Sequence, residues 1–360
     1  MSETLPLSVV VAVRDSGSTL KAALESIRST RLKRESYEII VVDDASRDDS
    51  VSIAARYADT IVRLSGLRSG PAYARNRGAE LARGEFVAFI EADVVIRPDT
   101  LPRMLEMLHA QPTAAALSAT RDEAAGATNF VSQYWNLLLR FGEEHYSTGC
   151  AQFGAGCGIV RRQAFIAAGM YDEWRFATEC LESAELGERL REAGHGVILS
   201  PDLKVGHLRR WNLSALASEV WTRGRLLART LGYRRMRASV PSEVVFTLTR
   251  SLVPVAVLLG SLSLSSAFIP SAHSAALASI FVAVVLFSNS SIHRFYADTR
   301  GVAFAIAAAP LHVFSQLVAG IALCTGWLLR DVFGDPSPDA TTQAYAEVGV
   351  EMWPPVRRRP

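Results

Sequence analysis

Two long stretches without charge constrain most strongly what this chain can fold into. No Asp, Glu, Lys or Arg occurs between Ser251 and His293 or between Gly301 and Leu329. Each stretch exceeds the ~20 apolar residues that a helix needs to cross ~30 Å of hydrocarbon. Because Pro270 divides the first stretch, we predict three membrane-spanning helices, near residues 246–269, 272–291 and 303–328. A buried helical bundle in a soluble protein is the alternative.

The amino-terminal part of the chain has a different composition. The apolar run Leu7–Val13 is too short for a secretory signal, lacks a preceding basic region and is followed at once by Arg14. We therefore expect this part to remain in the cytoplasm. The 38 basic and 36 acidic residues give a net charge of +2, which argues against a nucleic-acid binder on global charge alone.

Apolar runs alternate with helical patterns along this first part. Strands are predicted over residues 7–13, 38–44, 61–64 and 85–90, and helices over 18–29, 48–58 and 72–82. Short β-branched runs of this kind are typical of strands buried on both faces, and their alternation with helices predicts a doubly wound, mostly parallel α/β sheet.

Acidic residues follow two of the predicted strands. Asp43-Asp44 ends one strand, and Glu91-Ala92-Asp93 follows another. Ligands of open α/β sheets bind outside the carboxyl ends of the strands, so both groups should line one crevice. Paired carboxylates there suit Mg²⁺ or Mn²⁺, which bind oxygen ligands together with substrate phosphates. The sequence has no Walker P-loop, and no G-x-G-x-x-G follows the first strand.

The following segments mix shorter elements. Residues 154–165 read as a glycine-rich turn, a strand and the start of a helix, 182–196 as a helix, and 197–207 as strand, turn and strand.

The order LSVVVAV, YEIIVVDDASRDDS and GPAYARNRGAELARGEFVAFIEADV resembles the family 2 glycosyltransferases of GT-A fold. GAGCGIVRRQAFIAAGMYDE is similar to the acceptor-side segment of that family, and ESAELGERLREAGHGVILSPDLKVGH to its "ED" helix and the strands after it. The resemblance covers about residues 6–235.

The resemblance implies a set of site residues. Asp44 would contact the nucleotide base, and Glu91-Ala92-Asp93 occupies the D-x-D position. Asp93 would bind the metal, Mg²⁺ or Mn²⁺, with Glu91 facing the ribose or the metal. The implied nucleotide-binding residues are Ala12, Arg14, Asp44, Arg75 and Glu91.

The chain departs from the family at the "ED" helix, where Ser183 follows Glu182 instead of the usual Asp. A serine needs a neighbouring base before it can take a proton, whereas a carboxylate in a cleft can act directly. Glu182 is therefore the first candidate for the catalytic base, and Glu185, one turn further along, is the second. A solvated helix face or an inactive protein are the alternatives.

Residues 204–237 hold nine basic side chains and one acid, interleaved with Trp and Leu. This composition predicts amphipathic helices on an anionic membrane surface.

The sequence thus predicts a GT-A catalytic domain over 1–210, basic interfacial helices over 211–242, about three transmembrane helices over 243–330 and a flexible polar tail over 331–360. The expected function is inverting transfer of a single sugar from a UDP-, GDP- or dTDP-sugar to a lipid-linked or glycan acceptor, in glycan or glycolipid biosynthesis. The expected location is the inner membrane, with several crossings and the catalytic domain facing the cytoplasm. The alternatives are a nucleotidyltransferase and a degenerate sugar-nucleotide-binding subunit of a glycan assembly complex.

The basic residues also predict a topology. Arg234, Arg235, Arg237 and Arg250 put the amino end of the first span in the cytoplasm. Three spans would then leave the tail from Arg330 outside. A re-entrant or interfacial segment over 301–310, ending at Pro310, is the alternative.

Overall fold

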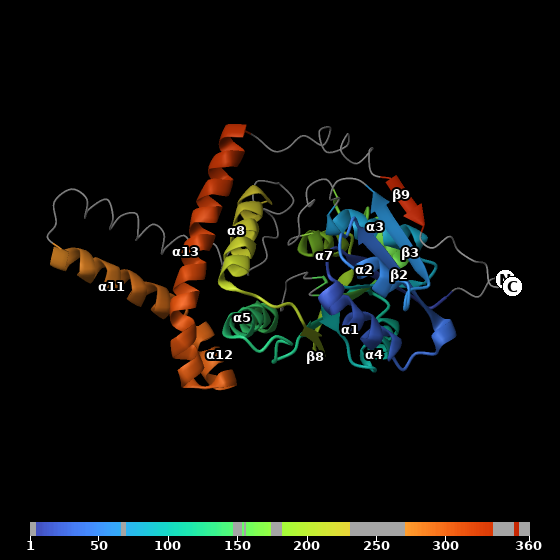
Figure 1. Ribbon diagram of the computed structural model, residues 1–360, viewed down its shortest axis with the longest axis horizontal. Helices are drawn as coiled ribbons and strands as arrows, with labels where there is room; N and C mark the ends of the chain where they lie inside the picture. The colour runs from blue at the N-terminus through green and yellow to red at the C-terminus, as the bar shows by residue number, and fades with distance from the viewer. Residues whose placement is uncertain are drawn as a thin grey trace. The chain divides into compact units, whose positions relative to one another are not determined.

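The computed structural model describes residues 5–65, 70–146, 153–154, 156–173, 182–230, 271–333 and 349–352. These residues divide into two compact units (Figure 1). The first unit consists of residues 1–127, 151–210 and 336–360, and the second of residues 128–150 and 211–335. The predicted first span, near 246–269, and the basic residues 231–237 lie outside the described part of the chain.

The first unit holds the sheet and the helices that cover it. Its strands are β1 (Leu7–Val13), β2 (Tyr37–Asp44), β3 (Thr60–Ser65), β4 (Phe86–Ile90), β5 (Val94–Val95), β6 (Ala114–Arg121), β7 (Cys157–Arg161), β8 (Gly196–His207) and β9 (Gly349–Met352). Its helices are α1 (Gly17–Arg28), the 3₁₀ turn Arg34–Ser36, α2 (Ser50–Ala54), α3 (Pro71–Leu81), α4 (Thr100–Ala110), α6 (Arg162–Ala167) and α7 (Glu182–Glu192).

The strand order is β5-β8-β6-β7-β4-β1-β2-β3-β9. Strands β4, β1, β2 and β3 are parallel neighbours, as predicted. Beyond them the sheet is mixed, because β7 lies antiparallel between β4 and β6, while β6 and β8 are parallel. Strand β8 runs through residues 197–207, and residues 201–203 bulge out of its pairing with β6 at the place of the predicted turn.

Two hydrophobic cores lie on opposite faces of the sheet. Val9 and Val11 of β1 belong to one core, together with side chains of α1 and α4. Val10 belongs to the other, with α3, α6 and α7. Successive residues of a strand point to opposite faces, so the continuous apolar run of β1 fills both cores. The predicted α/β fold with helices on both faces is confirmed.

The carboxyl-terminal segment adds a strand to this sheet. Strand β9 pairs antiparallel with β3, placing Gly349 opposite Ser65 and Met352 opposite Val62. Residues 349–352, expected within a flexible tail, therefore share a sheet with the amino-terminal strands. This pairing contradicts the expectation that the tail lies across a membrane from the first domain.

The second unit is helical. It contains α5 (Phe130–Tyr146), α8 (Leu213–Thr230), α11 (Ser271–Ser288), α12 (Ser290–Arg300) and α13 (Val302–Phe333). A core that includes Tyr134, Leu216 and Tyr296 joins α5, α8 and α12. Helix α13 continues through Pro310. Among the described residues one helix segment, Val302–Leu329, is long and apolar enough to cross a membrane.

Candidate active site

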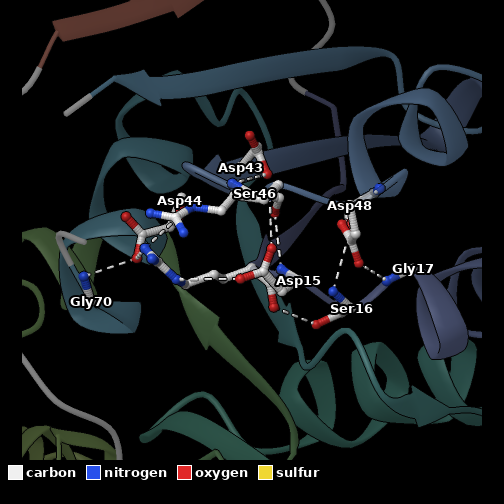
Figure 2. A network of polar contacts seen from close by, with 11 residues as sticks. Asp15, Ser16, Gly17, Asp43, Asp44, Ser46, Asp48 and Gly70 are labelled. Atoms are coloured by element: carbon white, nitrogen blue, oxygen red, sulfur yellow. Dashed lines mark hydrogen bonds and ion pairs between the residues drawn. The ribbon is translucent and has the colours of Figure 1, made fainter. Parts of the chain in front are cut away.

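The loops that follow β1 and β2 are joined by hydrogen bonds (Figure 2). The backbone N–H of Asp15 donates to Ser46 Oγ at 3.0 Å, and that of Gly17 donates to Asp48 Oδ2 at 2.8 Å. Asp15 and Ala45 adopt positive φ values of 44° and 56°, which are strained for residues with a side chain. The two loops are thus held together in a defined shape at the carboxyl edge of the sheet.

Asp44 is buried at the end of β2. Its Oδ2 accepts a hydrogen bond from the backbone N–H of Gly70 at 3.1 Å, as Figure 2 shows. Arg14 donates from Nη1 to the Asp44 carbonyl oxygen at 2.9 Å, and the same nitrogen lies 3.8 Å from Asp44 Oδ2. Ala12 is paired with Val42, two residues before Asp44. The structure therefore brings together Ala12, Arg14 and Asp44, three of the expected nucleotide-binding residues.

Asp43 faces a different environment from Asp44. Its side chain is fully buried, with Oδ1 accepting from the backbone N–H of Ser46 at 3.3 Å and Oδ2 lying 3.7 Å from Arg63 Nε. Asp43 is thus buried beneath the loops, next to Ser46 and Arg63, whereas Asp44 contacts Arg14 and Gly70.

Glu91 and Asp93 lie in the turn between β4 and β5, which backbone hydrogen bonds fix. Glu91 N–H donates to the Gly156 carbonyl at 2.9 Å, and Leu208 N–H donates to the Asp93 carbonyl at 2.7 Å. Desolvation raises the pKa of Glu91, and the negative charge of Asp93 raises it further, while Arg75 lowers it. Although its surroundings are desolvated, the Glu91 side chain keeps 42% of its surface exposed, so a ligand can reach it.

A small recess that is open to solvent borders this turn. It is lined by Arg75, Phe89, Glu91, Gly154, Gly156, Tyr171 and Ser183. Gly154 and Gly156 have positive φ values of 110° and 82°, and a Cβ on either would collide with Ser183 or His207 respectively. The glycine-rich turn is therefore explained by close approach of the chain to the recess.

Arg75 joins Glu182 to Glu91 across the recess. Its Nη1 donates to Glu182 Oε1 at 2.6 Å, its Nη2 lies 3.6 Å from Glu91 Oε1, and its guanidinium lies 5.7 Å from the ring centroid of Tyr171. Desolvation acts to lower the pKa of Arg75, but Glu182, Tyr171 and Glu91 together raise it. The arginine is therefore a fixed positive charge between two carboxylates.

The two candidate bases are placed differently. Glu182 is buried and paired with Arg75 at the recess. Glu185 accepts from both Nε and Nη2 of Arg189, at 2.7 and 2.6 Å. Arg189 also donates to the carbonyls of Ala168 and Met170, so this pair ties α7 to the end of α6. Of the two, only Glu182 is linked to residues of the recess.

Tyr171 was not singled out from the sequence. Burial raises its pKa, and a hydrogen bond links its side chain to Ser183. A tyrosine that remains protonated can donate a hydrogen bond but cannot remove a proton from a substrate. The aromatic residue before Asp172 carries no local signal in the sequence, because its place in the recess depends on α7 and α3.

The resemblance to GT-A glycosyltransferases implies a divalent metal, for which Glu91 and Asp93 are the expected ligands. Arg75 is paired with Glu182, and Glu91 and Asp93 supply carboxylate oxygens in the turn. No group of three or more His, Cys, Asp or Glu side chains within the described ranges is placed to hold a metal. Two carboxylates are nevertheless sufficient for Mg²⁺ when substrate phosphates and water complete its coordination.

His207 is a further residue that the sequence analysis did not single out. It ends β8, opposite Val94, and is buried without a hydrogen bond of ordinary geometry to either ring nitrogen. Burial and then the charge of Arg121 lower its pKa well below the usual range. A neutral imidazole therefore lies beside the Glu91–Asp93 turn, but within the described ranges it forms no three-residue metal group with Glu91 and Asp93. Its position at a strand end was the available signal.

Comparison with known proteins agrees with this geometry. Residues 8–168 match the profile of Glycosyl transferase family 2. This domain belongs to the family 2 glycosyltransferases.

EpsH of Bacillus subtilis, named as a glycosyltransferase, is 40% identical over 106 residues, which are 29% of this chain and 30% of EpsH. The succinoglycan biosynthesis protein ExoO of Rhizobium meliloti is 38% identical over 102 residues, which are 28% of this chain and 29% of ExoO. The chain thus spans about 30% of the length of these curated relatives.

The mannosyltransferase PcManGT of Pyrobaculum calidifontis, solved with GDP-Man and Mn²⁺, superposes with a TM-score of 0.60 at 20% identity, covering 87% of this chain and 88% of that protein. This similarity confirms the GT-A fold.

Proposed function

We propose that the chain is an inverting, metal-dependent glycosyltransferase that moves one sugar from a nucleotide-sugar to a membrane-associated, lipid-linked acceptor in glycan or glycolipid biosynthesis. The observation that carries the proposal is the convergence of Asp44, Glu91 and Asp93 at the carboxyl edge of a family 2 domain. One relative is named as a glycosyltransferase and another as a succinoglycan biosynthesis protein, which supports the class of reaction.

The donor would lie along the edge from β2 to β4. Asp44, with Arg14 and Ala12, would bind the nucleotide base, and Glu91 and Asp93 would bind the metal at the diphosphate. A bound Mg²⁺ or Mn²⁺ would supply positive charge that stabilises the departing diphosphate. The sugar would then face the recess between Glu91 and Tyr171, where Ser183 takes the place of a carboxylate.

Purified full-length protein with a panel of UDP-, GDP- and dTDP-sugars tests this function. Sugar transfer or donor hydrolysis that requires Mg²⁺ or Mn²⁺ is the expected result. Release of pyrophosphate would identify a nucleotidyltransferase instead. Nucleotide binding without any turnover would favour the degenerate subunit, the reading that Ser183 suggests.

We also propose that the second unit attaches the protein to the inner membrane, with the catalytic domain facing the cytoplasm. The apolar side chains of α13 support this location, since Ile306 is 69% and Leu328 65% exposed. Phe287 of α11 is 84% exposed. Apolar surface of this extent is typical of residues that contact lipid or a partner.

Strand β9 adds a condition on the topology. The pairing of β9 with β3 supports a topology in which residues 349–352 lie on the same side of the membrane as the catalytic sheet. In this proposal the chain would cross an even number of times, or α13 would lie along the membrane surface. We expect a fluorescent protein fused after residue 360 to be bright in cells and an alkaline phosphatase fusion there to be inactive. An active phosphatase fusion would contradict both the β9 pairing and this topology.

A further inference from the structure

Arg75 is shared unequally between its two carboxylates. The 2.6 Å contact with Glu182 is a short, charge-assisted hydrogen bond. The 3.6 Å separation from Glu91 is too long for a hydrogen bond and leaves only an electrostatic attraction. The guanidinium is therefore held by Glu182, and its interaction with Glu91 is weaker.

The two carboxylates also differ in access. The Glu182 side chain is 6% exposed, whereas that of Glu91 is 42% exposed. A general base must come within hydrogen-bond reach of the proton that it removes. Glu182 is directed to Arg75 and shielded from solvent, and Glu91 is the carboxylate that a ligand can approach.

Removing the charge of Glu182 would leave Arg75 with Glu91 as its neighbouring carboxylate in the recess. A buried arginine without a partner is strongly unfavourable, so the guanidinium would move toward Glu91. A divalent cation would then have to compete with an arginine for that carboxylate.

We propose that Glu182 is a positioning residue, which holds Arg75 back from Glu91 and so keeps Glu91 available to a divalent cation. This inference rests on the proposed metal-dependent function. It assigns Glu182 to the metal side of the site, not to deprotonation of the acceptor.

The test measures Mn²⁺ binding to the purified full-length protein, by calorimetry or electron paramagnetic resonance, with UDP and with GDP in turn. Glu182→Gln should bind Mn²⁺ about 10–100-fold more weakly, the range seen when a residue supporting a metal ligand is lost. A general base would instead leave Mn²⁺ binding unchanged and lower kcat alone. Unchanged Mn²⁺ affinity in Glu182→Gln overturns the inference while leaving the proposed function intact.

The double variant Arg75→Gln/Glu182→Gln separates positioning from a direct role. Without the arginine there is nothing for Glu182 to hold back, so Mn²⁺ affinity should return toward the wild-type value. If the double variant binds as weakly as Glu182→Gln, the inference is wrong.

Glu185→Gln is the matched control. Glu185 lies on α7, as Glu182 does, but its partner is Arg189, which forms no ion pair with Glu91. Its Mn²⁺ affinity should equal that of the wild type, and a loss there would mean that α7 is merely disturbed. Failure of the wild type to bind Mn²⁺ with either nucleotide would overturn the metal-dependent function together with this inference.

Discussion

Two groups of glutamate and arginine lie at opposite ends of the parallel strands and differ in how completely their carboxylates are hydrogen-bonded and buried. At the amino end, Glu38 accepts from Arg83 Nε and Nη2 at 2.9 and 2.6 Å through one oxygen. Its other oxygen accepts from Ser8 Oγ at 2.7 Å and from the backbone N–H of Arg83 at 2.9 Å. At the carboxyl end, Arg75 holds Glu182 closely but leaves Glu91 at 3.6 Å and partly exposed.

The same residue types thus serve different purposes. Where every oxygen of a buried carboxylate has a donor, as in Glu38, the group stabilises the fold by joining β1, β2 and the turn before β4. Where one carboxylate remains open beside a filled pair, as in Glu91, the group can accept a ligand. The difference lies in completeness of hydrogen bonding together with burial.

The largest effect on activity is expected at the carboxyl end of the strands, where Glu91 and Asp93 lie. Asp93→Asn removes one of the two negative charges proposed for the metal, and that metal would supply several kcal/mol of charge stabilisation. Sugar transfer should therefore fall by roughly 10³-fold or more, measured as kcat/KM with the donor found in the panel. Glu91→Asp should retain more activity, because the charge remains and only its reach changes.

Asp99→Asn provides the control for this variant. Asp99 is a partly exposed carboxylate six residues further along, paired with Arg103 at 3.8 Å. Full activity in Asp93→Asn would remove Asp93 from the site and with it the distinction between the two ends.

A smaller effect, on stability and not on binding, is expected at the amino end of the strands, in the group of Glu38 and Arg83. Glu38→Gln removes the charge from a buried carboxylate that accepts four hydrogen bonds, and hydrogen bonds to charged groups contribute about 1.5–3 kcal/mol each. Because glutamine keeps part of this bonding, the free energy of unfolding should decrease by about 2 kcal/mol. Urea titration measures the decrease.

Nucleotide-dependent Mn²⁺ binding should be unchanged in Glu38→Gln, since Glu38 lies at the other end of the strands. A large loss of Mn²⁺ affinity with little change in the free energy of unfolding would mean that the group of Glu38 and Arg83 also contributes to metal binding.

The sequence was sufficient for the parts of this arrangement that depend on local pattern. The buried runs of β1, β2 and β4 were predicted to within a few residues, because strands covered on both faces are continuously apolar. The turn that carries Glu91 and Asp93 followed from the end of β4. In each case the residues that allow the prediction lie within the same short segment as the predicted element.

Features that depend on distant segments could not be predicted. Arg75 and Glu182 are 107 residues apart, and nothing near either residue identifies its partner. The antiparallel insertion of β7 and the addition of β9 to β3 are likewise choices of strand pairing, which no local pattern encodes. For this reason the sequence analysis assigned Glu182 as the base without reference to its pairing with Arg75.

The smallest effect is expected for a group that is complete in its hydrogen bonds but exposed. Asp48 accepts from Gly17 N–H at 2.8 Å, Ser50 N–H at 3.0 Å and Ser50 Oγ at 2.5 Å. Desolvation acts to raise its pKa, but these hydrogen bonds outweigh it and lower the pKa below the usual 3.8. A carboxylate with a lowered pKa stabilises the folded state at pH values above 3.8, and this contribution is lost as the pH falls through the folded-state pKa.

Asp48→Asn should therefore lower the urea midpoint slightly at neutral pH, and the difference from wild type should disappear in acid below the folded-state pKa. If Asp48→Asn were as destabilising as Glu38→Gln at neutral pH, burial would not matter, and completeness of hydrogen bonding alone would distinguish the two ends of the sheet.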